Sequence, residues 1–103
     1  MKKATEKSIR SDLQDKLNKK GVFGKLYEDL VEDYISLWKT KNSLAKDIAT
    51  RGAMVDYTSN NGTVNRRKNE AVAELVKVSQ RMAGLLKEMG IEPTPEAVED
   101  DEL

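Results

Sequence analysis

Residues 25–51 carry apolar side chains at helical spacing around about half of a helix circumference. Two stripes run side by side through this segment, and together they comprise Leu26, Tyr27, Leu30, Val31, Tyr34, Leu37, Trp38, Leu44, Ala45 and Ile48. A helix that faces a single core needs an apolar arc of only about 100°. We therefore expect a long helix over residues 25–51, ended by Gly52, that contacts more than one partner.

A second long helix is expected over residues 69–90. Asn69 suits the N-cap position, and Gly90 followed by Ile91 is typical of a Schellman end in which Ile91 folds back on Leu86. The expected apolar face comprises Val72, Leu75, Val76, Ser79, Met82, Ala83, Leu86 and Met89, with Ala71, Val78 and Leu85 beside it. This helix is the simplest antiparallel partner for residues 25–51.

The basic N-terminal segment, residues 1–20, predicts a thinner helix over about residues 4–20. Ile9, Leu13 and Leu17 recur every four residues, and Gly21 follows them as a left-handed cap. A short helix with only three large apolar residues is marginal alone, so we expect it to pack on another element.

The connection between the two long helices has seventeen residues, whereas helical hairpins usually need about 2–8. Asn61-Gly62 favours a type I′ turn between strand-forming residues, which predicts a β-hairpin over residues 53–68. Counting outward from that turn places Tyr57 opposite Arg66 and Asp56 opposite Arg67. Because an isolated hairpin is barely stable in water, it should lie either on the helices or on another copy of the chain.

Together these elements predict a mainly α fold. It consists of an N-terminal helix and a long antiparallel helical hairpin whose connection carries a short β-hairpin. We expect residues 1–91 to form a single domain, since 103 residues leave little material for a second core. Residues 92–103 contain two prolines and six acidic residues, and are expected to form a disordered acidic tail.

The chain contains neither cysteine nor histidine, which excludes disulfides, a thiolate nucleophile, an imidazole base and the usual zinc sites. Glycine-rich phosphate motifs are also absent. We expect no enzymatic activity, no cofactor and no small-molecule substrate; a metal held by carboxylates is the enzymatic alternative that remains. No stretch has the length of a signal peptide or a membrane span, so a cytoplasmic location is expected.

Charge is distributed unevenly along the chain, although its sum is zero. Residues 91–103 contain six acidic and no basic residues, so the first ninety residues are net basic. Two basic clusters are candidates for contacting DNA phosphates without reading sequence: Lys2, Lys3, Lys7, Arg10, Lys16, Lys19 and Lys20, and then Arg66, Arg67 and Lys68. The alternative is a solvated basic surface and a solubilising acidic tail.

Two long helices with wide apolar arcs have more apolar surface than one helical hairpin buries, which predicts a homo-oligomer. The residues that we expect at the contact between copies are Leu30, Tyr34, Leu37, Trp38 and Leu44. A self-associating helical scaffold with no nucleic-acid role is the alternative function.

The order of these features resembles the small subunit of bacteriophage terminases over about residues 25–95. The matching parts are a hydrophobic hairpin strand, an Asn-Gly turn, a capped helix start and a Leu-Leu to Gly-x-x-Pro ending, at Met54, Val55, Asn61, Gly62, Asn69, Ala71, Leu85, Leu86, Gly90, Ile91 and Pro93. Glu70 stands where the family often has proline, and both residues suit the first helical position. Because the N-terminal segment is short, we expect no separate DNA-reading domain of the sort that some small subunits carry.

The resemblance implies a non-enzymatic packaging factor that forms oligomers, often rings. Such subunits bind double-stranded viral DNA at the packaging start and hand it to the large subunit, which holds the ATPase and nuclease. The hairpin is then expected at a subunit interface or in a crown, and the expected location is the cytoplasm of the bacterial host. The tail is expected to bind the large subunit or the portal through Glu96, Glu99, Asp100, Asp101 and Glu102.

Overall fold

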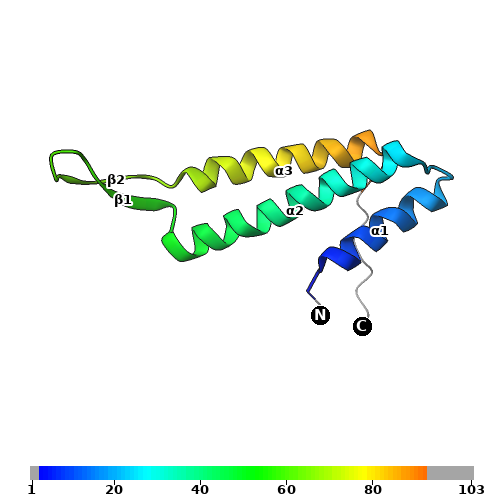
Figure 1. Ribbon diagram of the computed structural model, residues 1–103, viewed down its shortest axis with the longest axis horizontal. Helices are drawn as coiled ribbons and strands as arrows, with labels where there is room; N and C mark the ends of the chain where they lie inside the picture. The colour runs from blue at the N-terminus through cyan, green and yellow to red at the C-terminus, as the bar shows by residue number, and fades with distance from the viewer. Residues whose placement is uncertain (1–2, 93–103) are drawn as a thin grey trace, which may run out of the picture.

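The computed structural model describes residues 3–92 and contains three helices and one two-stranded antiparallel sheet (Figure 1). The elements are α1 (Glu6–Lys19), α2 (Lys25–Arg51), β1 (Met54–Thr58), β2 (Val64–Lys68) and α3 (Glu70–Glu88). This order confirms the predicted mainly α fold with a β-hairpin in the connection. Of the acidic tail, Glu96, Glu99, Asp100, Asp101 and Glu102 lie outside the described residues.

Helices α2 and α3 run antiparallel side by side, and α1 packs beside the first half of α2 (Figure 1). The β-hairpin projects from the opposite end of the helical pair. The radius of gyration is 18.5 Å, whereas a compact domain of this length has about 13 Å. A single copy is therefore extended and has one thin helical layer over much of its length.

The helix ends follow the local sequence. Gly21 and Gly90 both adopt left-handed φ angles, of 71° and 72°. In each case the next residue donates its amide back into the helix, from Val22 to Leu17 at 3.0 Å and from Ile91 to Leu86 at 2.9 Å. These bonds complete the two Schellman ends and confirm both glycine caps.

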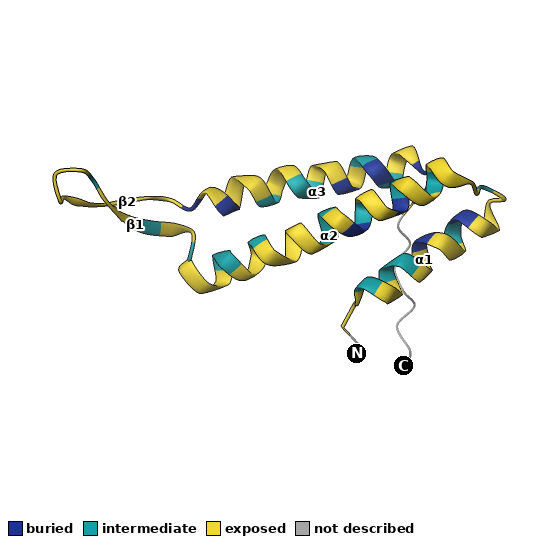
Figure 2. Cartoon of the chain, in the orientation of Figure 1, coloured by how far each residue is buried: buried dark blue, intermediate teal, exposed yellow. Residues whose placement is uncertain are grey.

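The core lies where α1, the first half of α2 and the last half of α3 meet (Figure 2). It contains Leu13, Leu17, Val31, Ile35, Leu85, Met89 and Ile91, all of which are buried. Toward the hairpin the buried side chains become few, and the main ones are Ala71 and Asn69 at the start of α3. One end of the helical pair is thus well packed while the other is thin.

The buried face of α3 agrees with the prediction only in part. Met82 of the predicted face is buried, and so are Ala71 and Leu85, which were expected beside it, whereas Val72 and Val76 of the predicted face are 38% and 53% exposed. Two apolar stripes lie next to each other on this helix, and α2 covers only the one that contains Ala71 and Leu85. The stripe with Val72 and Val76 has no helix against it within residues 3–92.

The register of the β-hairpin differs from the prediction by one residue. Asp56 pairs with Arg66 and Tyr57 pairs with Asn65, so the predicted pairs of Tyr57 with Arg66 and Asp56 with Arg67 were wrong. A longer loop causes the shift. Gly62 donates to the Ser59 carbonyl at 2.9 Å and has a φ of 85°, which is typical of a three-residue loop rather than a two-residue type I′ turn.

Candidate nucleic-acid interface

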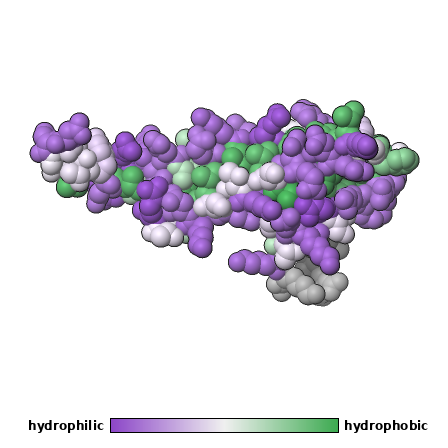
Figure 3. All heavy atoms as spheres, viewed as in Figure 1, coloured by the Kyte–Doolittle hydropathy of each residue, from purple (hydrophilic) through white to green (hydrophobic). Residues whose placement is uncertain are grey.

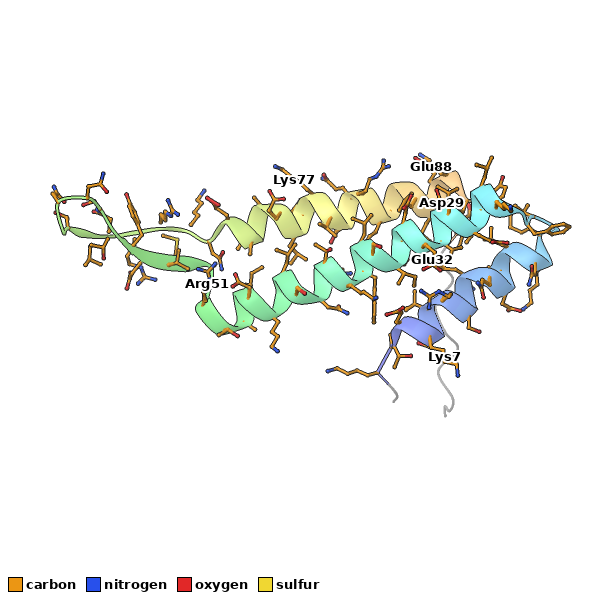
Figure 4. All side chains as sticks on the ribbon, in the orientation of Figure 1. Lys7, Asp29, Glu32, Arg51, Lys77 and Glu88 are labelled. Carbon is orange, nitrogen blue, oxygen red and sulfur yellow. The ribbon has the colours of Figure 1, made fainter. Side chains whose placement is uncertain are left out.

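The basic residues in and just before the first turns of α1 are of two kinds, exposed lysines and the ion-paired Arg10. Lys3 and Lys7 are exposed, and Lys7 lies on the side of α1 away from α2 (Figure 4). Lys2 lies outside the described residues. Lys3 and Lys7 thus present their ammonium groups to solvent.

Arg10 is held by carboxylates instead. Its guanidinium donates to both oxygens of Glu32 on α2, at 2.7 and 2.8 Å, and to Glu6 on α1 at 3.1 Å. Lys39 of α2 contacts the same Glu6 at 2.8 Å. Arg10 therefore joins α1 to α2, a structural role that its place in a basic run did not indicate.

These ion pairs also set the protonation of the two glutamates. Hydrogen bonds from Lys39, and then from Arg10, hold the pKa of Glu6 below its ordinary value. The Arg10 hydrogen bond lowers the pKa of Glu32 in the same way. Both carboxylates consequently stay ionised below the pH at which a free glutamate takes up a proton.

The remaining lysines of the N-terminal cluster lie at the end of α1. Lys16 and Lys19 each form an ion pair one turn away, with Asp12 at 3.8 Å and Asp15 at 3.2 Å. Together with Lys20 they line a shallow groove of about 350 Å³, whose other lining residues follow the end of α3. Part of the basic charge of α1 is thus balanced by acids on the same helix.

The second predicted cluster lies on β2, where Arg66, Arg67 and Lys68 are all exposed. Side chains alternate between the two faces of a strand, so Arg67 points to one face and its two neighbours to the other. The guanidinium of Arg67 lies 4.7 Å from the centroid of the Tyr57 ring. Arg66 lies 3.6 Å from Asp56, the residue directly opposite it.

The structure does not bring the two predicted basic clusters together. The β-hairpin projects from one end of the helical pair, and α1 packs beside the half of α2 at the other end (Figure 1). One copy of the chain therefore has two separate basic surfaces.

Asn69 anchors the hairpin to the helices and is only 1% exposed. Its side-chain amide donates to Asp47 at 3.0 Å and to the Gly52 carbonyl at 2.9 Å. Its side-chain oxygen accepts from the Ala71 amide at 2.9 Å and from Arg51 at 3.2 Å. Every hydrogen-bonding group of this side chain is satisfied, and the bonds join the end of α2 to the start of α3.

Sequence reasoning found only the capping role of Asn69. The additional signal was the spacing of Asp47 and Arg51, one helical turn apart, which form a two-bond ion pair at 2.8 and 3.0 Å. Hydrogen bonds from Arg51, and then from Asn69, lower the pKa of Asp47. The base of the hairpin is thus fixed by a small polar network, and Arg51 lies at the end of α2 beside it (Figure 4).

The residues predicted to contact another copy are all partly buried in one chain: Leu30, Tyr34, Leu37, Trp38 and Leu44. Leu30, Tyr34 and Leu37 pack at the edge of the core, and burial raises the pKa of Tyr34. Hydrophobic residues also reach the surface along α2 and α3 on the face shown in Figure 3. None of the five predicted residues is sealed inside one copy.

Residues 3–92 contain neither a candidate metal site nor a helix that could span a membrane. Within that range no three carboxylates gather in a way that could hold a metal ion. Over the same residues, no helix has the length and apolar character that crossing a membrane requires.

Comparison with known proteins identifies a family. A family model described as phage terminase, small subunit, matches residues 7–98, which is most of the chain. Neither the curated proteins nor the solved structures contain a match. The matched range includes α1, which the resemblance over residues 25–95 did not reach.

Proposed function

The chain belongs to the family of phage terminase small subunits, and from this membership we propose that it is a non-catalytic, ring-forming adaptor in viral DNA packaging. Membership places the chain in phage DNA packaging, and the small subunit of this family is generally the one without catalytic activity. In our proposal it binds double-stranded viral DNA at the packaging start. It then recruits or regulates the large subunit, which supplies the ATPase and nuclease.

The observation that carries the assembly is the uncovered apolar stripe on α3. Val72 and Val76 are exposed beside a helical pair whose α2 residues Tyr34 and Trp38 are only partly buried. Burying one valine side chain stabilises a contact by about 1.5–3 kcal/mol. If α2 of one subunit packs against α3 of the next, the same head-to-tail contact covers these surfaces in every copy. Such a contact generates a ring when the rotation between neighbouring subunits closes on itself.

The basic surfaces support DNA binding within that assembly. Each copy contributes the exposed lysines Lys3 and Lys7 and the basic strand β2. Repetition around a ring multiplies these contacts, so binding should be stronger for the assembly than for a single copy. Because phosphate contacts release counterions, this affinity should fall steeply with salt.

The acidic C-terminal residues are proposed to bind the large subunit or the portal. Residues 91–103 contain six acidic side chains and no basic ones. A segment of this composition suits a basic partner surface rather than DNA. The proposed location is the cytoplasm of the bacterial host, where packaging takes place.

One experiment tests assembly and DNA binding together. Analytical ultracentrifugation of the chain with and without a labelled duplex, at about 50 and 200 mM salt, should show an oligomer that associates with DNA only at the lower salt. An oligomer that binds no duplex at either salt would instead support a scaffold without a nucleic-acid role. A monomer that ignores DNA would overturn both functions.

A further inference from the structure

We propose that one face of the β-hairpin, formed by Tyr57, Asn65 and Arg67, enters the major groove of DNA and contacts base edges. This inference rests on the proposed DNA binding and names the surface that reads the DNA. It differs from contact by basic residues in general, because a base-reading face confers sequence preference.

The hairpin has the shape that a major groove admits. A two-stranded antiparallel ribbon fits the groove, which is about 12 Å wide. Nine of the ten strand residues are exposed, and Val55 is the one that is partly buried. The ribbon also extends beyond the helices, so a duplex can reach it without meeting α1 or α2 (Figure 1).

The register distinguishes the two faces of the ribbon. Tyr57 lies opposite Asn65, and Arg67 is two residues further along β2 on the same face. The other face contains Asp56, whose carboxylate lies 3.6 Å from Arg66. Lys68 lies on that second face as well, so each face has one net positive charge. The face of Tyr57 differs in presenting no carboxylate, which the phosphates that line a groove would repel.

The face of Tyr57, Asn65 and Arg67 carries side chains suited to base recognition. Arginine binds guanine through O6 and N7, and asparagine binds adenine through N6 and N7. The ring of Tyr57 lies 4.7 Å beneath the Arg67 guanidinium, which orients the cation while leaving its N–H edges free to donate. The Asn69 network fixes the base of the hairpin, so the ribbon approaches DNA in a defined direction.

The α1 surface is the weaker candidate for reading bases. Arg10, Lys16 and Lys19 each contact carboxylates on α1 or α2. Lys3 and Lys7 remain exposed. A lysine ammonium is a point charge, however, and lacks the planar fork with which arginine donates two parallel hydrogen bonds to one base.

The test begins with duplexes selected from a random pool by the wild-type protein. The affinity of Arg67→Ala for the enriched duplex should fall by about tenfold or more, and that of Asn65→Ala should fall as well. Arg81→Ala removes the same charge from an exposed position on α3 and should bind within about twofold of wild type. Tyr57→Phe retains the ring and should bind like wild type, while Tyr57→Leu should not.

Methylation of guanine N7 in the enriched duplex separates the grooves, because this atom lies in the major groove. Methylated sites should interfere with wild-type binding.

If selection enriches no sequence, or if Arg67→Ala and Arg81→Ala bind equally, the inference is overturned and the proposed function survives. If the wild type binds no duplex at all, the base-reading face and the proposed DNA-binding function are both overturned. Circular dichroism should show the same helix content in every variant, since all the changed side chains are exposed.

Discussion

Asn69 is the residue whose replacement should affect folding most at the thin end of the molecule. Asn69→Ala leaves the Gly52 carbonyl and the Asp47 carboxylate without their amide donor and removes the cap from Ala71. Each lost hydrogen bond costs about 0.5–1.5 kcal/mol at such partly buried groups, and a lost N-cap costs about 1 kcal/mol. Urea unfolding should show a loss in that range.

Asn42→Ala is the matched control for this change. Asn42 is exposed in the interior of α2, and alanine is the better helix former there. Its stability should equal or slightly exceed that of wild type. A loss of stability for Asn69→Ala no larger than the change for Asn42→Ala would show that the network is dispensable.

Two glycines should respond to alanine in opposite directions. Gly62 has a φ of 85° and open space around its Cα, so Gly62→Ala costs only the left-handed conformation, about 1–2 kcal/mol. Gly84 lies inside α3, also with open space, and alanine there should stabilise the helix by about 0.5–1 kcal/mol.

Different probes follow these two changes. Exchange of the Ser59 and Gly62 amides, which are bonded across the loop, should speed up about fivefold or more in Gly62→Ala. The urea midpoint should rise in Gly84→Ala. Unchanged loop exchange in Gly62→Ala would mean that the observed loop geometry is not the stable one in solution.

Among the elements, the attachment of α1 to α2 should depend on pH. The folded pKa of Glu32 is lowered below the ordinary value of 4.5 by Arg10. The stabilisation from this pair is thus present above that value and is lost as the pH falls through the folded pKa.

A double-mutant cycle of Arg10→Gln and Glu32→Gln measures that coupling. The two changes should be non-additive near pH 7, and they should become additive as the pH falls through the folded pKa of Glu32 and its carboxylate takes up a proton. Coupling of the same size above and below that pKa would show that packing rather than charge joins α1 to α2.

The sequence predicted elements better than the contacts between them. The range of α2 was correct because its periodicity is long and glycines flank it at positions 24 and 52. The predicted hairpin register was wrong because a two-residue loop and a three-residue loop both fit Asn61-Gly62. Only the φ of Gly62 and its hydrogen bond to the Ser59 carbonyl distinguish the two loops. A one-residue shift exchanges every partner across the strands.

The same limit applies to α3 and to Asn69. Two apolar stripes on α3 fit the helical period equally well, and the position of α2 decides that Leu85 rather than Val76 is buried. For Asn69, the local sequence indicates a cap, but its bond to Asp47 joins residues 22 positions apart. The spacing of Asp47 and Arg51 indicates their own ion pair, but nothing local to either segment indicates that Asn69 joins it.

For the whole molecule, copies are proposed to assemble through the uncovered stripe of α3. Val76→Gln should weaken association because it replaces an apolar contact with a polar side chain, while the folding of a single copy should change little at a position that is 53% exposed. Glu74→Gln places the same side chain at an exposed position on another side of α3 and is the matched control.

Native mass spectrometry of the wild type, Val76→Gln and Glu74→Gln at matched concentrations shows whether copies assemble through this stripe. We expect one closed stoichiometry for the wild type and for Glu74→Gln, and a shift toward smaller species for Val76→Gln. A wild type that stays monomeric at tens of micromolar, or an oligomer that Val76→Gln leaves intact, would contradict this assembly.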